Sequence, residues 1–332
     1  PEAVAQILAE LKQPAVRNRL SEAACQFVPE NWARRAALEV LAGKLSKSNL
    51  EEAFELGTTG FFVNLQQSQC ELETVLMLYP DRATVCVSCQ VGCAVGCAFC
   101  ATGRLGLTRN LAAWEIVEQV RAVRARLPDP TSRVHGVVFQ GMGEPLANLD
   151  AVLQAIRVLH DPCALGVDAR AITVCTAGLP AGIRRLAREA PRVRLGLSLS
   201  SAIAAHRARV MPIACHHGLD DVLAATADHA RATGLAPMWA VTLLAGVNDA
   251  DADAEALAAT ARAFWTDTGA RPRISVLDYN AIGPGDPFAR SPRLAAFRAV
   301  LSAAGLPSHR RYSGGADVAA ACGQLAAAPP AL

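Results

Sequence analysis

Cys93-Ala-Val-Gly-Cys97-Ala-Phe-Cys100 places three cysteines at CxxxCxxC spacing, after a candidate strand at 83–88. An iron–sulfur cube needs a thiolate on each iron, and four cysteines are the usual supply. Three closely spaced cysteines would hold three irons and leave the fourth open to a small chelating molecule. Cys93, Cys97 and Cys100 are therefore candidate ligands of one [4Fe–4S] cluster that passes an electron to that molecule.

Two other uses of the three cysteines stay open on the residues alone. Free cysteine packs well as a small apolar residue, and thiolates also hold structural zinc. His135 and His160 lie downstream without the spacing of metal ligands. We favour the cluster over zinc and over a purely structural role.

Short apolar runs alternate with longer segments of helical period from Ala83 onward. The candidate strands are 83–88, 134–139, 171–176, 193–198, 237–244 and 274–279. The candidate helices are 111–126, 149–160, 179–188, 219–233, 251–266 and 293–304. This alternation is typical of a parallel sheet covered by helices. Six such units predict an α/β fold, an incomplete (β/α)6 barrel with its chemistry at the C-terminal ends of the strands.

Candidate functional strings follow five of the six predicted strands. They are Cys93–Cys100, Gly141-Met-Gly-Glu144-Pro145, Cys175-Thr-Ala-Gly178, Ser198-Leu199-Ser200 and Asn280. Because the carboxyl ends of parallel strands meet at one rim, we expect these strings to share one site.

The segments outside the barrel predict accessory structure. Residues 1–70 are expected to form a small N-terminal helical domain ahead of a core at 71–332. Four aromatic residues are candidates for the core of the leading segment: Trp32, Phe54, Phe61 and Phe62. Further along, we expect extended chain at 71–79 and 308–312 and a last helix at 316–326.

The composition indicates a large core and an intracellular protein. The chain has 332 residues, of which 52% are hydrophobic, and 11 cysteines. That cysteine count and an N-terminus without a secretory pattern predict the cytoplasm, and we expect no membrane span. The net charge is only +2, which excludes a wholly electrostatic nucleic-acid binder. All basic residues except Lys12, Lys44 and Lys47 are arginines, which fit phosphates but also suit a GC-rich genome.

Three strings together resemble one family of enzymes. They are Cys86-Val-Ser-Cys-Gln-Val-Gly-Cys93, Gly141-Met-Gly-Glu-Pro145 and Ala321-Cys322-Gly-Gln-Leu325. CxxxCxxC after a first strand is the hallmark of radical S-adenosylmethionine enzymes, and the full set resembles their RlmN/Cfr branch, which methylates adenine in 23S ribosomal RNA. The resemblance runs from about Glu71 to Leu325. It implies a radical-SAM barrel, a [4Fe–4S] cluster and S-adenosylmethionine.

The resemblance also implies a mechanism, because an adenine carbon is not nucleophilic enough for simple methyl displacement. Cys322 would be the methyl carrier and would take a methyl group from a first S-adenosylmethionine. A second S-adenosylmethionine would yield the radical that removes hydrogen from the S-methyl group. Cys86 would then resolve a protein–RNA adduct by a disulfide bond with Cys322, and Glu73 matches the proton acceptor.

Other positions match contacts to S-adenosylmethionine in the family. A carboxylate facing a ligand ammonium makes a charge-assisted bond, which the resemblance assigns to Glu144 beside Gly143. The remaining predicted contacts are Cys175, Ser198, Leu199, Ser200 and Asn280. The family has serine where this chain has Cys175 and histidine where it has Ser200. Cys89 also replaces a family serine, and we expect it to take no part in the reaction.

The resemblance implies an RNA substrate, a low-potential electron donor such as a flavodoxin, and a monomer. Several arginines are candidates to grip phosphates: Arg34, Arg35, Arg104, Arg109, Arg310 and Arg311. The RNA, ribosomal or transfer, and the adenine carbon stay open. Two other functions also stay open: a radical enzyme acting on a protein or metabolite, and a non-catalytic RNA-binding relic.

Overall fold

A computed structural model describes residues 61–67, 72–79, 81–125, 127, 133–283, 285–311 and 321–325. The described residues belong to a compact unit that spans Gly60–Leu332. Trp32, Phe54, Arg34 and Arg35 lie outside them. Phe61 and Phe62 lie in a strand, so the expectation of helix over 1–70 is wrong for residues 61–67.

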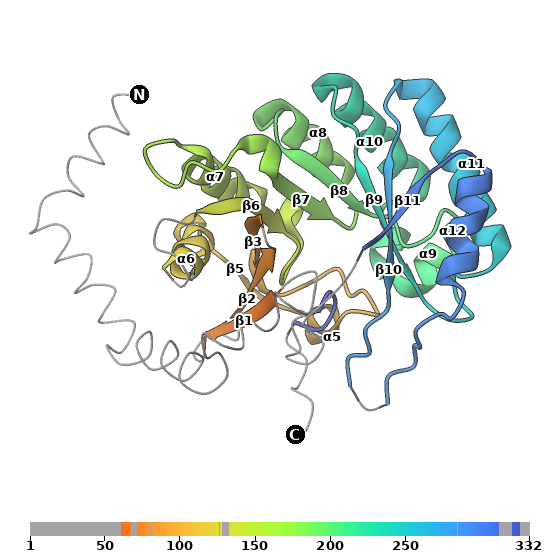
Figure 1. Cartoon of the computed structure of the whole chain (residues 1–332), viewed down its shortest axis with the longest axis horizontal. Coiled ribbons are helices and arrows are strands. Elements are labelled where there is room, and N and C mark those ends of the chain that lie inside the picture. The colour runs from red at the N-terminus through yellow and green to blue at the C-terminus, as the bar shows by residue number, and fades with distance from the viewer. Residues whose placement is uncertain are drawn as a thin grey trace, which may run out of the picture. The chain divides into compact units, whose positions relative to one another are not determined.

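One curved sheet forms the centre of the fold (Figure 1). Its nine strands follow the order β1-β2-β3-β6-β7-β8-β9-β10-β11. Neighbours from β3 to β11 are parallel, whereas β1 and β2 form an antiparallel edge. The strands are β1 (Phe61–Gln67), β2 (Leu72–Tyr79), β3 (Arg82–Val87), β6 (Val134–Phe139), β7 (Ile172–Thr176), β8 (Arg194–Ser198), β9 (Met238–Leu243), β10 (Arg273–Asp278) and β11 (Ser308–Arg311).

Long helices cover the outer side of the sheet (Figure 1). They are α6 (Ala113–Arg124), α7 (Leu149–His160), α8 (Pro180–Glu189), α10 (Leu219–Thr233), α11 (Asp251–Thr268) and α12 (Leu294–Ala303). None of these or the other described helices has the length and hydropathy needed to cross a bilayer.

The hydrophobic core fills the space between the sheet and these helices. Val85, Val137 and Val174 of adjacent strands are fully buried and pack in one cluster with α6 and α7. In a second cluster under α10 and α11, Trp239 meets Phe264 edge to face, with ring centroids 5.1 Å apart. Burial of such β-branched and aromatic side chains is the main stabilising contribution in a fold of this kind.

The incomplete barrel predicted from the sequence is confirmed. All six expected strands and all six expected helices are present, and β6, α7 and α10 have the expected bounds. β1 and β11 end the strand order without pairing to each other, so the barrel is open. The short β11 adds a seventh parallel strand beside β10.

The chain around Cys322 differs from the expected last helix. Residues 321–325 form turns, and Gly323 has φ +87°, which an α-helix does not accommodate. The backbone here bonds to another part of the chain, because the Ala101 N–H donates to the Gly323 carbonyl at 2.8 Å. The rest of the expected helix, 316–320 and 326, lies outside the described residues.

Candidate active site

A small hairpin frames the loop that carries the three cysteines. β4 (Gln90–Gly92) and β5 (Leu107–Asn110) pair antiparallel, and the loop leaves β4 and ends at the short helix α5 (Ala101–Leu105). Gly92 has φ +75°, and a Cβ there would lie 1.9 Å from the Gly106 carbonyl oxygen. Only glycine allows this turn.

The three thiols of this loop are near one another and partly buried. Burial raises the pKa of Cys93 to about 12 and also raises the pKa values of Cys97 and Cys100, and Cys100 adds to the rise at both Cys93 and Cys97. A buried thiolate without a positive partner is costly. Ligation to iron would remove that cost, because a coordinating thiol is deprotonated by the metal.

Backbone groups of the loop oppose the effect of burial on these thiols. The backbone of Val95 lowers the pKa of Cys93, and the backbone of Gly103 and of Thr102 lowers that of Cys100. Across the described ranges, no three His, Cys, Asp or Glu side chains converge on a point suited to a single metal ion. A cluster does not need that arrangement, because each cysteine binds a different iron.

Glu144 lies at the start of the next rim segment, after β6. Its side chain is only 4% exposed, and its two oxygens accept from the N–H groups of Leu146 (3.0 Å) and Ala177 (2.7 Å). Burial raises the pKa of this carboxyl, and the bonds from Ala177, Thr176 and Leu146 oppose the rise. A buried carboxylate held in this way suits a cationic ligand group.

Arg207 of α9 (Ala204–Val210) is a site residue that the sequence analysis missed. It is 1% exposed, and its Nη2 donates to the Ala177 carbonyl. Nε and Nη1 are buried without a hydrogen-bond partner among the described residues. Burial lowers its pKa, whereas the nearby Cys97 raises it. Arginine stays charged in proteins, so this buried cation lacks a bonded anion.

The backbone of one residue, Ala177, links Arg207 and Glu144. The Ala177 N–H donates to Glu144, and the Ala177 carbonyl accepts from Arg207. A cation and an anion are thus held by the backbone of one residue directly after β7. This pairing matches the opposite charges of an α-amino acid group. Only packing of α9 against the rim brings Arg207 here, so no local pattern in the sequence indicates it.

Ser198, Leu199 and Ser200 follow β8 in a constrained turn. Ser200 is buried and has φ +60°, the one non-glycine with positive φ among the described residues. Asn248 Nδ2 donates to its carbonyl at 2.7 Å. Such strained backbone tends to occur at functional sites. Leu199 is buried in the second core cluster, so contact with a cofactor would come from its backbone.

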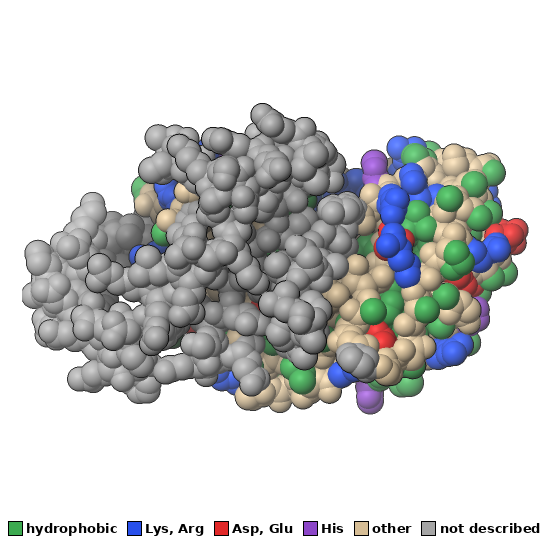
Figure 2. Space-filling model, turned by 60° about the horizontal axis from the view of Figure 1, so that its bottom comes forward, with side chains coloured by type: hydrophobic (Ala, Val, Ile, Leu, Met, Phe, Trp, Pro, Cys, Tyr) green, Lys and Arg blue, Asp and Glu red, His purple; other side chains and the backbone are tan. Residues whose placement is uncertain are grey.

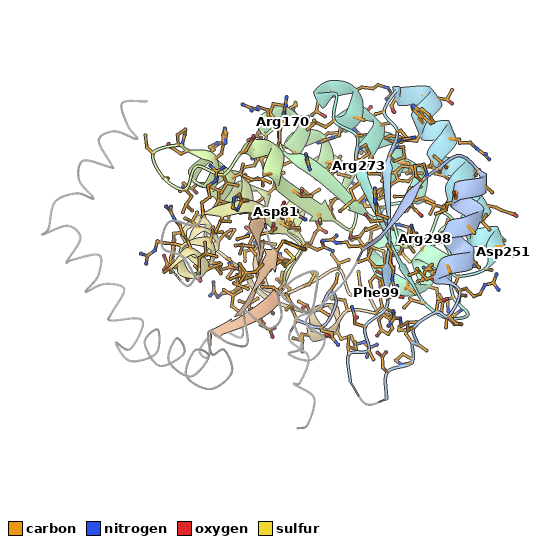
Figure 3. The ribbon with its side chains drawn as sticks, in the orientation of Figure 1. Asp81, Phe99, Arg170, Asp251, Arg273 and Arg298 are labelled. Carbon is orange, nitrogen blue, oxygen red and sulfur yellow. The ribbon has the colours of Figure 1, made fainter. Side chains whose placement is uncertain are left out.

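The segment that carries Cys322 is bonded to the cluster loop and to the end of β10. Thr102 Oγ1 donates to the Leu325 carbonyl at 2.8 Å, in addition to the bond between Ala101 and Gly323. Asn280 Nδ2 donates to the Cys322 carbonyl at 3.2 Å. Asn280, predicted as a cofactor contact, therefore also anchors this segment. Phe99 of the cluster loop lies near the lower end of β10, away from Arg273 at its start (Figure 3).

Cys86, Cys175 and Cys322 share one electrostatic environment. Burial raises the pKa of Cys86 to about 12, with further contributions from Cys322 and Cys175, while Arg311 opposes them. Burial raises the pKa of Cys175 to about 12 as well, and Arg311 again opposes. The structure thus brings the predicted carrier and the predicted resolving cysteine close together, with Cys175 as a third thiol beside them.

Glu73 lies in β2, the strand that pairs with β3, which carries Cys86. It is 4% exposed, and its carbonyl accepts from Ser88 Oγ at 2.6 Å. The residue two positions on, Val75, pairs in register with Cys86. Val75 also packs with Leu325 in a small cluster that Cys86 borders. Glu73 is therefore on the strand next to Cys86, and its role as proton acceptor stays a prediction.

Three of the arginines expected to grip phosphates are paired with carboxylates instead. Their partners lie at 2.8–3.1 Å and are Asp286 for Arg104, Glu115 for Arg109 and Asp278 for Arg310. All three arginine side chains are exposed, so their contact with phosphate stays a prediction. Arg311 instead lies among the thiols, with a buried Nη1 that has no hydrogen-bond partner in the described part of the chain. Basic side chains also adjoin one another on the side of the molecule that Figure 2 shows.

Comparison with known proteins places this site in a family. The chain is 62% identical over 268 residues to a probable RNA methyltransferase of Sorangium cellulosum, covering 74% of this chain and 68% of the relative. It is 43% identical over 262 residues to a probable dual-specificity RNA methyltransferase RlmN of Chloroflexus aurantiacus, covering 77% and 69%. The chain belongs to the RlmN-type family of radical S-adenosylmethionine RNA methyltransferases. No family model matches it.

Solved structures agree with membership of the RlmN-type family. A radical SAM methyltransferase from Sphaerobacter thermophilus superposes with a TM-score of 0.73 at 37% identity, covering 93% of this chain and 96% of the other. The hydrogenase maturase HydG from Carboxydothermus hydrogenoformans has a TM-score of 0.52 at 15% identity. The second likeness shows the fold alone. The family recognised in the sequence and its radical-SAM barrel are thus confirmed, and the family implies a [4Fe–4S] cluster and S-adenosylmethionine.

Proposed function

We propose that this RlmN-type protein adds a methyl group to a carbon atom of adenine in RNA and that Cys322 carries the group. The single observation that supports this best is the anchoring of residues 321–325 to the cluster loop. Through the bonds of Ala101 to Gly323 and Thr102 to Leu325, Cys322 is held beside the residues that would hold the cofactor. Its sulfur is also exposed, as an attacking group must be.

Glu144 and Arg207 would bind the amino-acid end of S-adenosylmethionine. Glu144 would accept from the α-ammonium, and Arg207 would donate its unpaired Nε and Nη1 to the α-carboxylate. Cys93, Cys97 and Cys100 would hold the cluster. When bound, cluster and cofactor supply the carbon radical that this chemistry requires. The turn at Ser200 would border the remaining part of the site.

Cys322 and Cys86 would act in different steps of the reaction. The Cys322 sulfur would take a methyl group from one S-adenosylmethionine, so that a turnover consumes two. After a hydrogen atom passes to the radical that cluster and cofactor would supply, the carrier carbon would add to adenine, and the adduct would return one electron to the oxidised cluster as the ring carbon loses its proton. Cys86 would then attack the Cys322 sulfur, release the RNA and leave a disulfide bond that an external thiol reduces. Glu73, buried on β2, would take the proton that the adenine carbon loses.

The substrate would be ribosomal RNA, with transfer RNA as the second candidate, because relatives are named dual-specificity RNA methyltransferases. Arg311, at the thiols and without a partner at Nη1, would face the splayed-out base or its phosphate. A flavodoxin-like donor would supply the electron, and the protein would act as a monomer in the cytoplasm. The relic and the enzyme acting on a protein or metabolite find no observation in their favour.

The test is nucleoside mass spectrometry on RNA treated with the reduced, cluster-loaded protein and S-adenosylmethionine. Methyladenosine should appear with the native protein and be absent with Cys322→Ala. Cys163→Ala is the matched control, because Cys163 is exposed and outside the site. Methyladenosine formed equally by Cys322→Ala would remove the carrier, and no product from the native protein on either RNA would reject the function.

A further inference from the structure

Gln140, the residue that follows β6, lies between two thiols of the site. Its Nε2 donates to Cys322 Sγ at 3.3 Å. Its Oε1 accepts from Cys175 Sγ at 3.6 Å, within the longer range that sulfur allows. One amide therefore connects the exposed carrier thiol to a buried thiol of β7, and neither the sequence analysis nor the comparisons assigned Gln140 a role.

The chemistry of the two thiols determines which way the amide faces. Burial raises the pKa of Cys175 to about 12, so its sulfur keeps its proton near neutral pH and can donate. A donor must meet the carbonyl end of the amide, because the NH2 end has no acceptor capacity. The NH2 end is thereby directed to Cys322, whose sulfur accepts.

The neighbouring strand β8 leaves room for the sulfur of Cys175. Cys175 pairs in register with Gly196 of β8, and a Cβ at Gly196 would lie 2.8 Å from Cys175 Sγ. A side chain at position 196 would displace the thiol. The thiol at position 175 is thus accommodated by its neighbouring strand, and it has a partner in Gln140.

We propose that Gln140 holds and aims the carrier sulfur of Cys322, and that Cys175 is a positioning residue that fixes the orientation of the Gln140 amide. This rests on the proposed function of Cys322. In the step concerned, the sulfur attacks as a thiolate. A bond forms from sulfur to the methyl carbon as the bond from that carbon to the sulfonium breaks, and S-adenosylhomocysteine leaves. An N–H donor stabilises the anionic sulfur and fixes its direction.

The test measures how fast iodoacetamide alkylates Cys322 in the reduced, cluster-loaded full chain, with peptide mass spectrometry as the readout. Exposed Cys163 and Cys215 in the same molecule report the intrinsic rate. Gln140→Met removes the donor at similar length, and Gln140→Glu places a repelling carboxylate beside the sulfur. We expect Cys322 to react about fivefold more slowly in Gln140→Met and more slowly still in Gln140→Glu.

Cys175 is tested in the same assay. Cys175→Ser keeps a hydroxyl donor for Gln140 and should react at nearly the native rate, whereas Cys175→Ala should be slower. The double variant Gln140→Met, Cys175→Ala should be no slower than Gln140→Met alone, because both changes break one chain of contacts. Three results would overturn the proposal. They are additive losses of alkylation rate in the double variant, equal rates in Cys175→Ser and Cys175→Ala, and native rates in both Gln140 variants.

This assay uses neither RNA nor S-adenosylmethionine, so it separates the two proposals. If the native protein fails to methylate RNA while the order of alkylation rates holds, the proposed function falls and the thiol–amide contact stands. If the native protein methylates RNA but the alkylation rates do not follow this order, the proposed function stands and the role of Gln140 is rejected. Incubation with S-adenosylmethionine alone, followed by mass spectrometry of the Cys322 peptide, should show S-methylcysteine formed in the same order of rates.

Discussion

The backbone of Ala101 donates to the carbonyl of Gly323 at 2.8 Å and so ties the cysteine-rich loop to a segment more than two hundred residues away. Ala101 follows Cys100, and Gly323 follows Cys322. A direct bond between these two backbones fixes the carrier candidate next to the cluster candidate. This bond makes the cluster loop and the segment that carries Cys322 parts of one site.

The three loop cysteines should account for the iron of the protein. Replacement of any one by alanine is expected to reduce bound iron from about four atoms per chain to about none, because a cube held by two thiolates is labile. Colorimetric iron analysis of anaerobically reconstituted protein measures this. Cys215→Ala is the control, since Cys215 is exposed and outside the loop. Unchanged iron in Cys97→Ala would exclude the loop as the cluster site.

Gly143→Ala should destabilise the protein through a steric clash at the site. Gly143 has φ +99°, and an added Cβ would lie 2.5 Å from Gln90 Cβ. Gln90 Oε1 accepts from the Glu144 N–H at 2.8 Å, so the clash also disturbs Glu144. We expect a loss of about 2–4 kcal/mol in the free energy of unfolding, measured by urea denaturation.

The matched control for this glycine is Gly166→Ala. Gly166 has φ +63°, and its added Cβ would meet nothing within 4 Å. The Gly166→Ala variant has the backbone strain without the clash, and its free energy of unfolding should fall by about 1 kcal/mol. Equal losses at the two glycines would show that backbone conformation alone matters and that the contact with Gln90 does not.

Arg207→Met should weaken binding of S-adenosylmethionine about tenfold or more, because an unpaired buried guanidinium is the proposed partner of the carboxylate. Calorimetry on cluster-loaded protein gives the affinity. Decarboxylated S-adenosylmethionine supplies the cross-check, since the native protein and the variant should bind it equally. A loss of the same size for both ligands would assign Arg207 a packing role.

Cys86→Ala should trap a covalent protein–RNA adduct, visible as a slower band on a denaturing gel and mapped to Cys322. In the native protein the adduct should decay faster as pH rises. Burial keeps the pKa of Cys86 near 12, so its thiolate fraction grows about tenfold per pH unit between about pH 7 and 9. An adduct lifetime in the native protein that does not change with pH would exclude Cys86 as the attacking thiol.

The parallel core was predictable because its signals are local. Runs such as Val134–Phe139 are short, apolar and bounded by turns, and Leu149–His160 has a clear helical period, so both have the expected bounds. Position along the strands then placed Cys93, Glu144 and Cys175 on one rim. The topology of parallel sheets supplied that step, since strand ends converge whatever their distance in sequence.

The features that the sequence did not reveal depend on distant contacts. The turn at 321–325 is bonded to the cluster loop, and this tertiary contact overrides the helical preference of an alanine-rich segment. Arg207 and Gln140 reach the site only through packing of α9 and the end of β6. Arg104, Arg109 and Arg310 pair with carboxylates, and these partners could not be assigned from a single sequence.

The most direct measurement of the central claim uses S-adenosylmethionine whose methyl group carries three deuterium atoms. Transfer through Cys322 with loss of one hydrogen to a radical predicts methyladenosine that retains two deuterium atoms, seen by nucleoside mass spectrometry of the treated RNA. A product that retains all three would mean direct displacement, and it would contradict a role for Cys322 as carrier and for the cluster as the source of the radical.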